Sequence, residues 1–170
     1  MRYRGFLGRI LMSGTLFAVA AGCLETETVL APPEQGVVDA KLVGDWKIAG
    51  EDGKSTDVTV RNFDGHMFYV EMREADHDAE RYAAHIAQVK GASFAHIRPL
   101  SDDGTIERKY VLMRVDRVDD NKVNLRHFKE DFFADKPHET TAQLRAIIEQ
   151  NLDNAAMYDG DPFPMTRKTQ

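Results

Sequence analysis

Residues 58–73 read VTVRNFDGHMFYVEMR, and this stretch decides the fold. Apolar and polar side chains alternate from Val58 up to the Asp64-Gly65 dipeptide, and the alternation resumes at Phe68. A period of two places the apolar set on one face of a β-strand. The Asp-Gly pair tolerates the positive φ angles of a tight hairpin turn. The stretch therefore predicts two antiparallel strands, each with one buried face.

The same pattern repeats along the chain. Further two-residue turn candidates recur roughly every dozen residues, and they are Asp52-Gly53, Lys90-Gly91, Asp103-Gly104 and Asp120-Asn121. Short alternating segments lie between them, for example residues 111–115 and 123–126. Repeated short strands with tight turns predict a mainly β fold, an antiparallel up-and-down meander or barrel of about seven to eight strands. We expect seven of these strands before Phe128.

The segment from Glu80 to Val89 fits two structures. Its alanines and the spacing of Tyr82, Ile86 and Val89 also suit a short helix. The turn at Lys90-Gly91 and the β-like residues that follow it favour a strand, because the two segments then form a hairpin.

One amphipathic helix is expected near the C-terminus, over residues 141–152. Thr140 and Gln143 form a capping-box pair at its start. Its apolar face consists of Leu144, Ile147, Ile148 and Leu152. After a meander, such a helix is expected to pack on the outside or the open end of the sheet. Residues 163–167 can add a last edge strand, and we assign residues 41–170 to a single β-rich domain.

The N-terminus has the layout of a secretory signal. Three arginines within residues 1–9 precede about a dozen mostly apolar residues, 10–21, a run too short to span a bilayer. The run ends in VAAGC at 19–23, and Cys23 is the only cysteine. This ending resembles the lipobox of bacterial lipoproteins. The resemblance implies fatty acylation of Cys23 and, because Leu24 rather than Asp follows, a place in the outer membrane facing the periplasm.

We accordingly read residues 1–22 as a signal peptide and residues 23–40 as a lipidated cysteine followed by a flexible tether. Residues 24–40 combine Glu, Pro and Gly without a helix or strand period, which is typical of a linker. Val37 and Val38 are the part of this tether that could pack on the domain. The alternative is an ordinary signal peptide that leaves Cys23 as a free thiol.

Composition excludes several function classes. The chain carries 28 acidic and 22 basic side chains, a formal net charge of −6, and three of the basic ones lie in the signal. An acidic domain is a poor nucleic-acid binder, since phosphate binding needs clustered Lys and Arg. A single cysteine allows neither a disulfide nor a thiolate zinc site. The partners expected are the membrane, through the lipid on Cys23, and a small apolar ligand or an envelope protein.

The tripeptide Gly44-Asp45-Trp46 resembles the G-x-W signature of lipocalins. That resemblance implies an up-and-down barrel in which the tryptophan closes the base and a late arginine stacks on it. Arg126 is the first candidate for this arginine and Arg167 the second. The chain departs from the family in lacking a disulfide and a second lipocalin motif. It is similar to lipocalin-like envelope lipoproteins, a group that implies no activity.

Few residues have the pattern of a chemical site. His85 and His96 face each other if their strands turn at Lys90-Gly91, and with a third ligand they could hold a metal. The alternative is a pair of half-exposed strand histidines. The acidic loop Asp76-His77-Asp78 fits either calcium binding or a solvated loop. Ser93 lies in GASFA, which lacks the second glycine of a nucleophile elbow. No cofactor is predicted.

The sequence therefore favours a lipid-anchored, non-enzymatic binding or accessory domain of the cell envelope, holding a small apolar or amphipathic ligand. The alternative is an envelope interaction or scaffold protein whose filled barrel binds a protein partner. An enzyme ranks third, because no catalytic constellation emerges from the residues.

Overall fold

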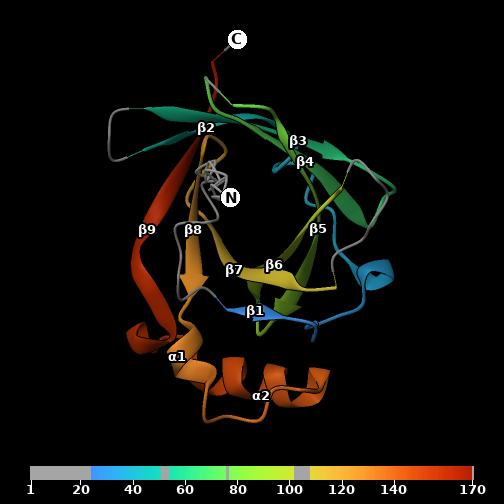
Figure 1. Ribbon diagram of the computed structural model, residues 1–170, viewed down its shortest axis with the longest axis vertical. Coiled ribbons are helices and arrows are strands. Elements are labelled where there is room, and N and C mark those ends of the chain that lie inside the picture. Colours follow the sequence, from blue (N-terminus) through green and yellow to red (C-terminus); the bar gives the residue numbers. More distant parts are fainter. Residues whose placement is uncertain (1–23, 51–53, 76, 102–107, 170) are drawn as a thin grey trace, which may run out of the picture.

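The computed structural model describes residues 24–50, 54–75, 77–101 and 108–169. The eight barrel strands are β2 (Gly44–Ala49), β3 (Ser55–Asn62), β4 (Met67–Arg73), β5 (Glu80–Val89), β6 (Ala92–Pro99), β7 (Tyr110–Arg117), β8 (Lys122–Phe128) and β9 (Tyr158–Arg167). Each pairs antiparallel with the next, and β9 pairs with both β8 and β2, which closes the barrel (Figure 1). A two-residue strand, β1 (Glu25–Thr26), adds to β7.

The prediction of a mainly β, antiparallel barrel is confirmed. So is the strand at residues 80–89, since β5 pairs with β4 on one side and with β6 on the other. The helical spacing in this segment has a different cause. Residues 82–87 are buried on both faces, so the strand lacks the polar alternation of its neighbours. The C-terminal segment is a full closing strand rather than an edge strand.

The helices are few and short. They are α1 (Glu130–Phe133), α2 (Thr141–Asn151) and two 3-10 turns, η1 (Pro33–Gln35) and η2 (Ala155–Met157). The capping box is present at the start of α2, where the Thr140 hydroxyl accepts from the Gln143 amide. Within the described part of the chain, no helix combines the length and the apolar character needed to cross a membrane.

The molecule has two hydrophobic cores, one on each face of the sheet. The barrel interior is filled by side chains that share a face across neighbouring strands, such as Trp46, Val58 and Met72. The second core lies between the outer face of the sheet and α2, where Leu144 and Ile148 are completely buried. Figure 1 shows α2 lying outside the barrel, as its apolar face predicts.

The expected flexible tether is wrong for the described residues. Residues 24–38, here called the strap, are packed on the barrel: most of the segment crosses its outer face, and Val38 at the end packs against the interior core. Leu24 and Leu30 are buried in the second core, and the Leu24 amide donates to the Phe128 carbonyl at 3.0 Å. The two leucines leave no periodic signal in this segment, yet both pack into the core between the sheet and α2. Cys23 lies outside the described residues.

The Trp46→Ala variant tests the barrel core. Trp46 is fully buried, and its indole N–H donates to the Leu42 carbonyl at 2.9 Å. We expect Trp46→Ala to lower the free energy of unfolding by about 3–5 kcal/mol, as core truncations of large aromatic side chains do. Chemical denaturation followed by circular dichroism measures this change.

The matched control is Phe63→Ala, because the Phe63 side chain is 62% exposed at the β3–β4 turn. Its effect should stay within about 0.5 kcal/mol. Equal losses in both variants would mean that Trp46 is not a core residue.

Candidate functional site

The arginine that stacks on Trp46 is Arg167, and the expectation for Arg126 is wrong. The Arg167 guanidinium carbon lies 4.1 Å from the centroid of the Trp46 ring. The two residues are direct register partners across β9 and β2, so both project into the barrel. Arg126 instead lies over the Tyr158 ring at 5.6 Å and pairs with Asp116 at 3.3 Å.

Arg167 also orders the chain that leads into β2. Its Nη1 donates to the Val43 carbonyl at 3.1 Å, its Nη2 to the Lys41 carbonyl, and its Nε to the Asp120 carbonyl at 2.9 Å. These bonds join the β7–β8 turn to residues 41–43. The segment therefore stays folded across one end of the barrel, where Leu42 packs into the interior core.

A cleft of about 600 Å³ lies beside this closed end. The pairing of β6 with β7 reaches only to Ser93 and Val115 at this end, while β7 continues to Arg117. The cleft opens beside this part of β7, which β6 does not pair with. Its floor is aliphatic, and its rim carries charged side chains of both signs. The floor includes Leu42, Ile86 and Val115, and the rim includes Asp39, Lys90 and Arg117.

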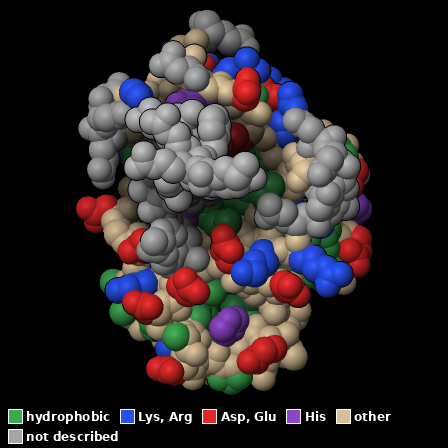
Figure 2. Space-filling model, in the orientation of Figure 1, with side chains coloured by type: hydrophobic (Ala, Val, Ile, Leu, Met, Phe, Trp, Pro, Cys, Tyr) green, Lys and Arg blue, Asp and Glu red, His purple; other side chains and the backbone are tan. Residues whose placement is uncertain are grey.

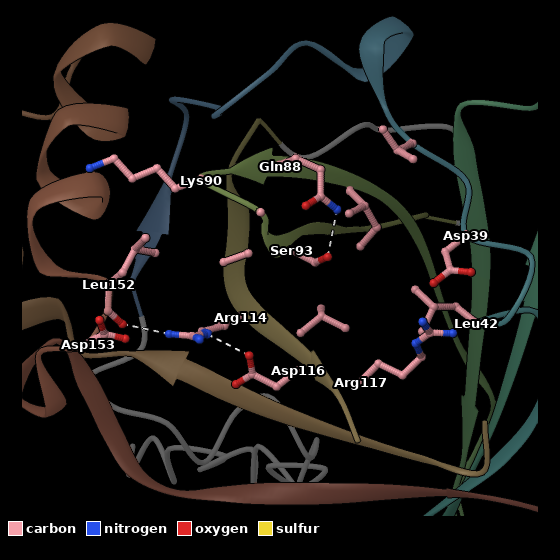
Figure 3. A pocket seen from close by; sticks show the side chains of 15 residues that line it. Asp39, Leu42, Gln88, Lys90, Ser93, Arg114, Asp116, Arg117, Leu152 and Asp153 are labelled. Carbon is pink, nitrogen blue, oxygen red and sulfur yellow. Dashed lines mark hydrogen bonds and ion pairs between the residues drawn. The ribbon is translucent and has the colours of Figure 1, made fainter. Parts of the chain in front are cut away.

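Figure 3 shows how the polar groups of the cleft lie. Arg114 and Asp116 project from β7 toward the end of α2, and Gln88 faces Ser93 across the β5–β6 pair. Asp39 and Arg117 lie on the opposite side of the cleft from Lys90. The cleft thus offers charged groups on two walls, with aliphatic side chains and the hydrogen-bonded Gln88–Ser93 pair between them.

Arg114 is a structural residue of the wall. Its Nε donates to Asp116 at 2.8 Å, and its Nη1 donates to the Leu152 carbonyl at 2.7 Å and the Tyr158 hydroxyl at 2.9 Å. These bonds tie the chain after α2 to β7. Arg117, by contrast, is exposed, and its closest carboxylate is Asp120 at 3.6 Å. Arg117 is therefore a better candidate than Arg114 for contact with a ligand.

The face-to-face placement of His85 and His96 is confirmed, and their expected half exposure is wrong. They are register partners with rings stacked at 4.7 Å, and both are almost completely buried. The strap covers them: the Leu30 amide donates to His96 Nε2 at 3.1 Å, and His85 Nε2 bonds to the Ala31 carbonyl at 2.9 Å. Both Nε2 atoms are therefore committed to backbone partners.

The remaining sequence candidates lie apart. Among the described residues, no group of three His, Cys, Asp or Glu side chains has metal-site geometry. The Ser93 hydroxyl accepts from the Gln88 amide at 2.8 Å, and His96 lies on the opposite face of β6. Of the acidic loop, Asp76 lies outside the described residues and His77 pairs with Glu74 at 3.4 Å.

Sequence reasoning missed the cleft. Arg114 and Asp116 occupy the alternate positions of β7 that point away from the barrel interior, so in the sequence they look like ordinary surface residues. Figure 2 shows Asp and Glu side chains interspersed with Lys and Arg over one face, so charge alone marks no site there. The cleft depends on where β6 begins relative to the end of β7, and no local pattern encodes that offset.

The Gly44→Ala variant tests the closed end. At Gly44, with φ of +151°, an added Cβ would lie 2.2 Å from Arg167 Nη1. Arg167 is held by three carbonyls and cannot move away freely. We therefore expect the clash to lower the free energy of unfolding by about 1–3 kcal/mol, in addition to the cost of placing alanine at a positive φ. Denaturation followed by Trp46 fluorescence measures this loss.

Gly65→Ala is the control, because Gly65 also has a positive φ, +89°, but nothing lies within 4 Å of its added Cβ. A Gly44→Ala loss no larger than that of Gly65→Ala would contradict the role of Arg167.

Comparisons of the chain with protein-family models, with curated proteins and with solved structures return no match. The function of the protein is therefore inferred from its own residues, and two features carry the inference. They are the cleft at the closed end of the barrel and the strap that leads to it.

Proposed function

We propose that this protein is a lipid-anchored, non-enzymatic binding protein of the bacterial cell envelope that holds a small amphipathic ligand in the cleft. The cleft of about 600 Å³ carries the proposal. Its size falls in the range of small-molecule sites, about 300–1,000 Å³. The lipobox-like ending at Cys23 supports the anchor, and the outer membrane facing the periplasm is the proposed location.

The chemistry of the cleft favours an amphipathic ligand over a purely apolar one. The barrel interior is packed with side chains such as Trp46, Phe68 and Val123, so apolar groups occupy the place of an apolar ligand. The cleft has an aliphatic floor but a rim with Lys90 and Arg117. A ligand with an apolar body and a charged group would contact both surfaces.

The same contacts argue against catalysis in the cleft. Arg114 and Asp116 pair with each other at 2.8 Å, and the hydrogen-bond partner of the Ser93 hydroxyl is the Gln88 side-chain amide, which is not a base. A nucleophile needs a neighbouring base within hydrogen-bond reach. The described polar groups of the cleft are thus arranged to contact a ligand and not to react with it.

A protein-binding role is the second candidate. Three large hydrophobic side chains are markedly exposed among the described residues: Val37, Phe63 and Val118. Phe63 and Val118 lie in the β3–β4 and β7–β8 turns, which are at the same end of the barrel. Their place at one end of the barrel is the observation that supports this second candidate.

Cleft binding is tested with anilinonaphthalene sulfonate, an anion with an apolar ring system. We expect saturable, one-to-one binding by fluorescence titration. Ser93→Trp should abolish it, because the indole would fill the cleft beside Val115. Arg117→Glu should weaken it by reversing a rim charge.

Ser101→Trp is the matched control, since Ser101 is exposed and lies at the other end of β6. Unchanged binding in Ser93→Trp, with a native circular dichroism spectrum, would contradict the cleft as the site. A stoichiometric envelope protein recovered with the chain, and lost in Phe63→Asp, would favour the second candidate.

The anchor is tested separately. In a bacterial host, the wild-type chain should incorporate labelled palmitate and fractionate with outer membranes, and Cys23→Ala should do neither. The control is Ser13→Ala, which leaves the residues next to Cys23 intact. Label in the Cys23→Ala protein would refute lipidation at this position.

A further inference from the structure

The strap is held on the barrel at several points along its length. At its start, Glu25 and Thr26 pair with β7. In its middle, Leu30 and Ala31 bond to the buried histidines. At its end, the Val37 amide donates to the Ile86 carbonyl at 3.0 Å. Glu25 also forms an exposed ion pair with Lys109 at 3.6 Å. The histidine contacts differ in that a buried titratable ring bonds directly to the strap backbone.

Hydrogen-bond roles fix the charge that the pair can carry. His96 Nε2 accepts the Leu30 amide proton, which requires the neutral ring with its proton on Nδ1. If His96 were protonated, both of its ring nitrogens would carry a proton. The Nε2–H would then point at the Leu30 N–H, so two donors would face each other and the hydrogen bond would be lost. His85 donates to the Ala31 carbonyl and can do so in either state, but its ring lies 4.7 Å from His96. His96 is therefore the residue at which a proton breaks a contact.

The surroundings of the pair disfavour a positive charge. Arg98 of β6 and Arg145 of α2 are the nearby cations, and Arg145 donates to the Leu30 carbonyl at 3.0 Å. Glu34 in η1 is the nearby carboxylate, and Tyr110 of β7 presents its ring edge-on to both histidines. Burial lowers the pKa of His96 to about 3 and lowers the pKa of His85 as well.

We propose that His85 and His96 form a proton-sensitive latch that holds the strap on the barrel while His96 is neutral and releases it when His96 is protonated. Release converts residues 24–38 into the flexible linker that their composition predicts. It also frees the end of the strap, where Val37 forms part of the cleft wall. Protonation of His96 would therefore change the wall of the cleft and the distance that residue 24 can reach from the barrel.

The direction of the pH dependence follows from proton uptake on release. In the held strap His96 stays neutral, while in the released strap its pKa returns toward the ordinary value of about 6.5. Above that value no proton is taken up, and the strap is held fully. As the pH falls below about 6.5, release takes up one proton and becomes about tenfold more favourable per pH unit.

Amide hydrogen exchange of the intact protein tests the latch. The protection factor of the Leu30 amide, corrected for intrinsic exchange, should fall about tenfold per pH unit between about pH 6 and pH 4.5. The protection factor of Val58, which lies between two barrel strands, should stay constant over the same range. A constant Leu30 value, or a fall shared by Val58, would overturn the latch.

Two variants give a second readout. His96→Gln can still accept the Leu30 amide proton through its side-chain oxygen but cannot be protonated, so its Leu30 protection should not change with pH. His77→Gln is the control, because His77 is partly exposed in the β4–β5 loop and should leave the wild-type profile unchanged. A wild-type profile in His96→Gln would overturn the assignment. If His96→Gln does not fold, the wild-type comparison of Leu30 with Val58 decides the question alone.

Discussion

The pairing of β9 with β2 is the contact on which the other features depend. It joins residues more than a hundred positions apart and turns an open meander into a closed barrel. Closure places Arg167 across from Trp46 and brings the guanidinium to the carbonyls of residues 41–43. Those residues then fold over the end of the barrel, and Leu42 becomes part of the cleft floor. The cleft therefore exists because the last strand returns to the first full one.

Burial of β5 and β6 on both faces is the second constraint. The interior core covers one face, and the strap with α2 covers the other. The apolar outer face of this part of the sheet is buried only if other segments pack on it. The strap provides part of this packing through two buried leucines, Leu24 and Leu30. The histidine pair lies beneath this cover, where burial lowers the pKa of both rings and the Nε2 atom of each ring bonds to the strap backbone.

The parts of the fold that local patterns encode were predictable. Alternation and turn dipeptides located the strands, the capping box at Thr140 located α2, and the turn at Lys90-Gly91 set the register of His85 with His96. The missed features all depend on contacts between distant segments. The sequence places Arg126 before Arg167 as the partner of Trp46, because only the closed barrel shows which arginine faces the indole. The composition of the strap predicts a tether, because composition describes the free chain and not the groove between the sheet and α2 that receives it.

The burial of Leu24 bears on how the barrel would stand relative to a bilayer. With the proposed lipid on Cys23, the buried Leu24 follows the acylated residue directly, so no linker lies between the lipidated position and the packed strap. Leu24 bonds to Phe128 at one end of β8, and Val118 lies just before the other end. At about 3.3 Å per residue, the seven residues of β8 hold these points roughly 20 Å apart. In the held state, the turns that contain Phe63 and Val118 would thus face away from the lipid, toward whatever occupies the space beyond the membrane surface.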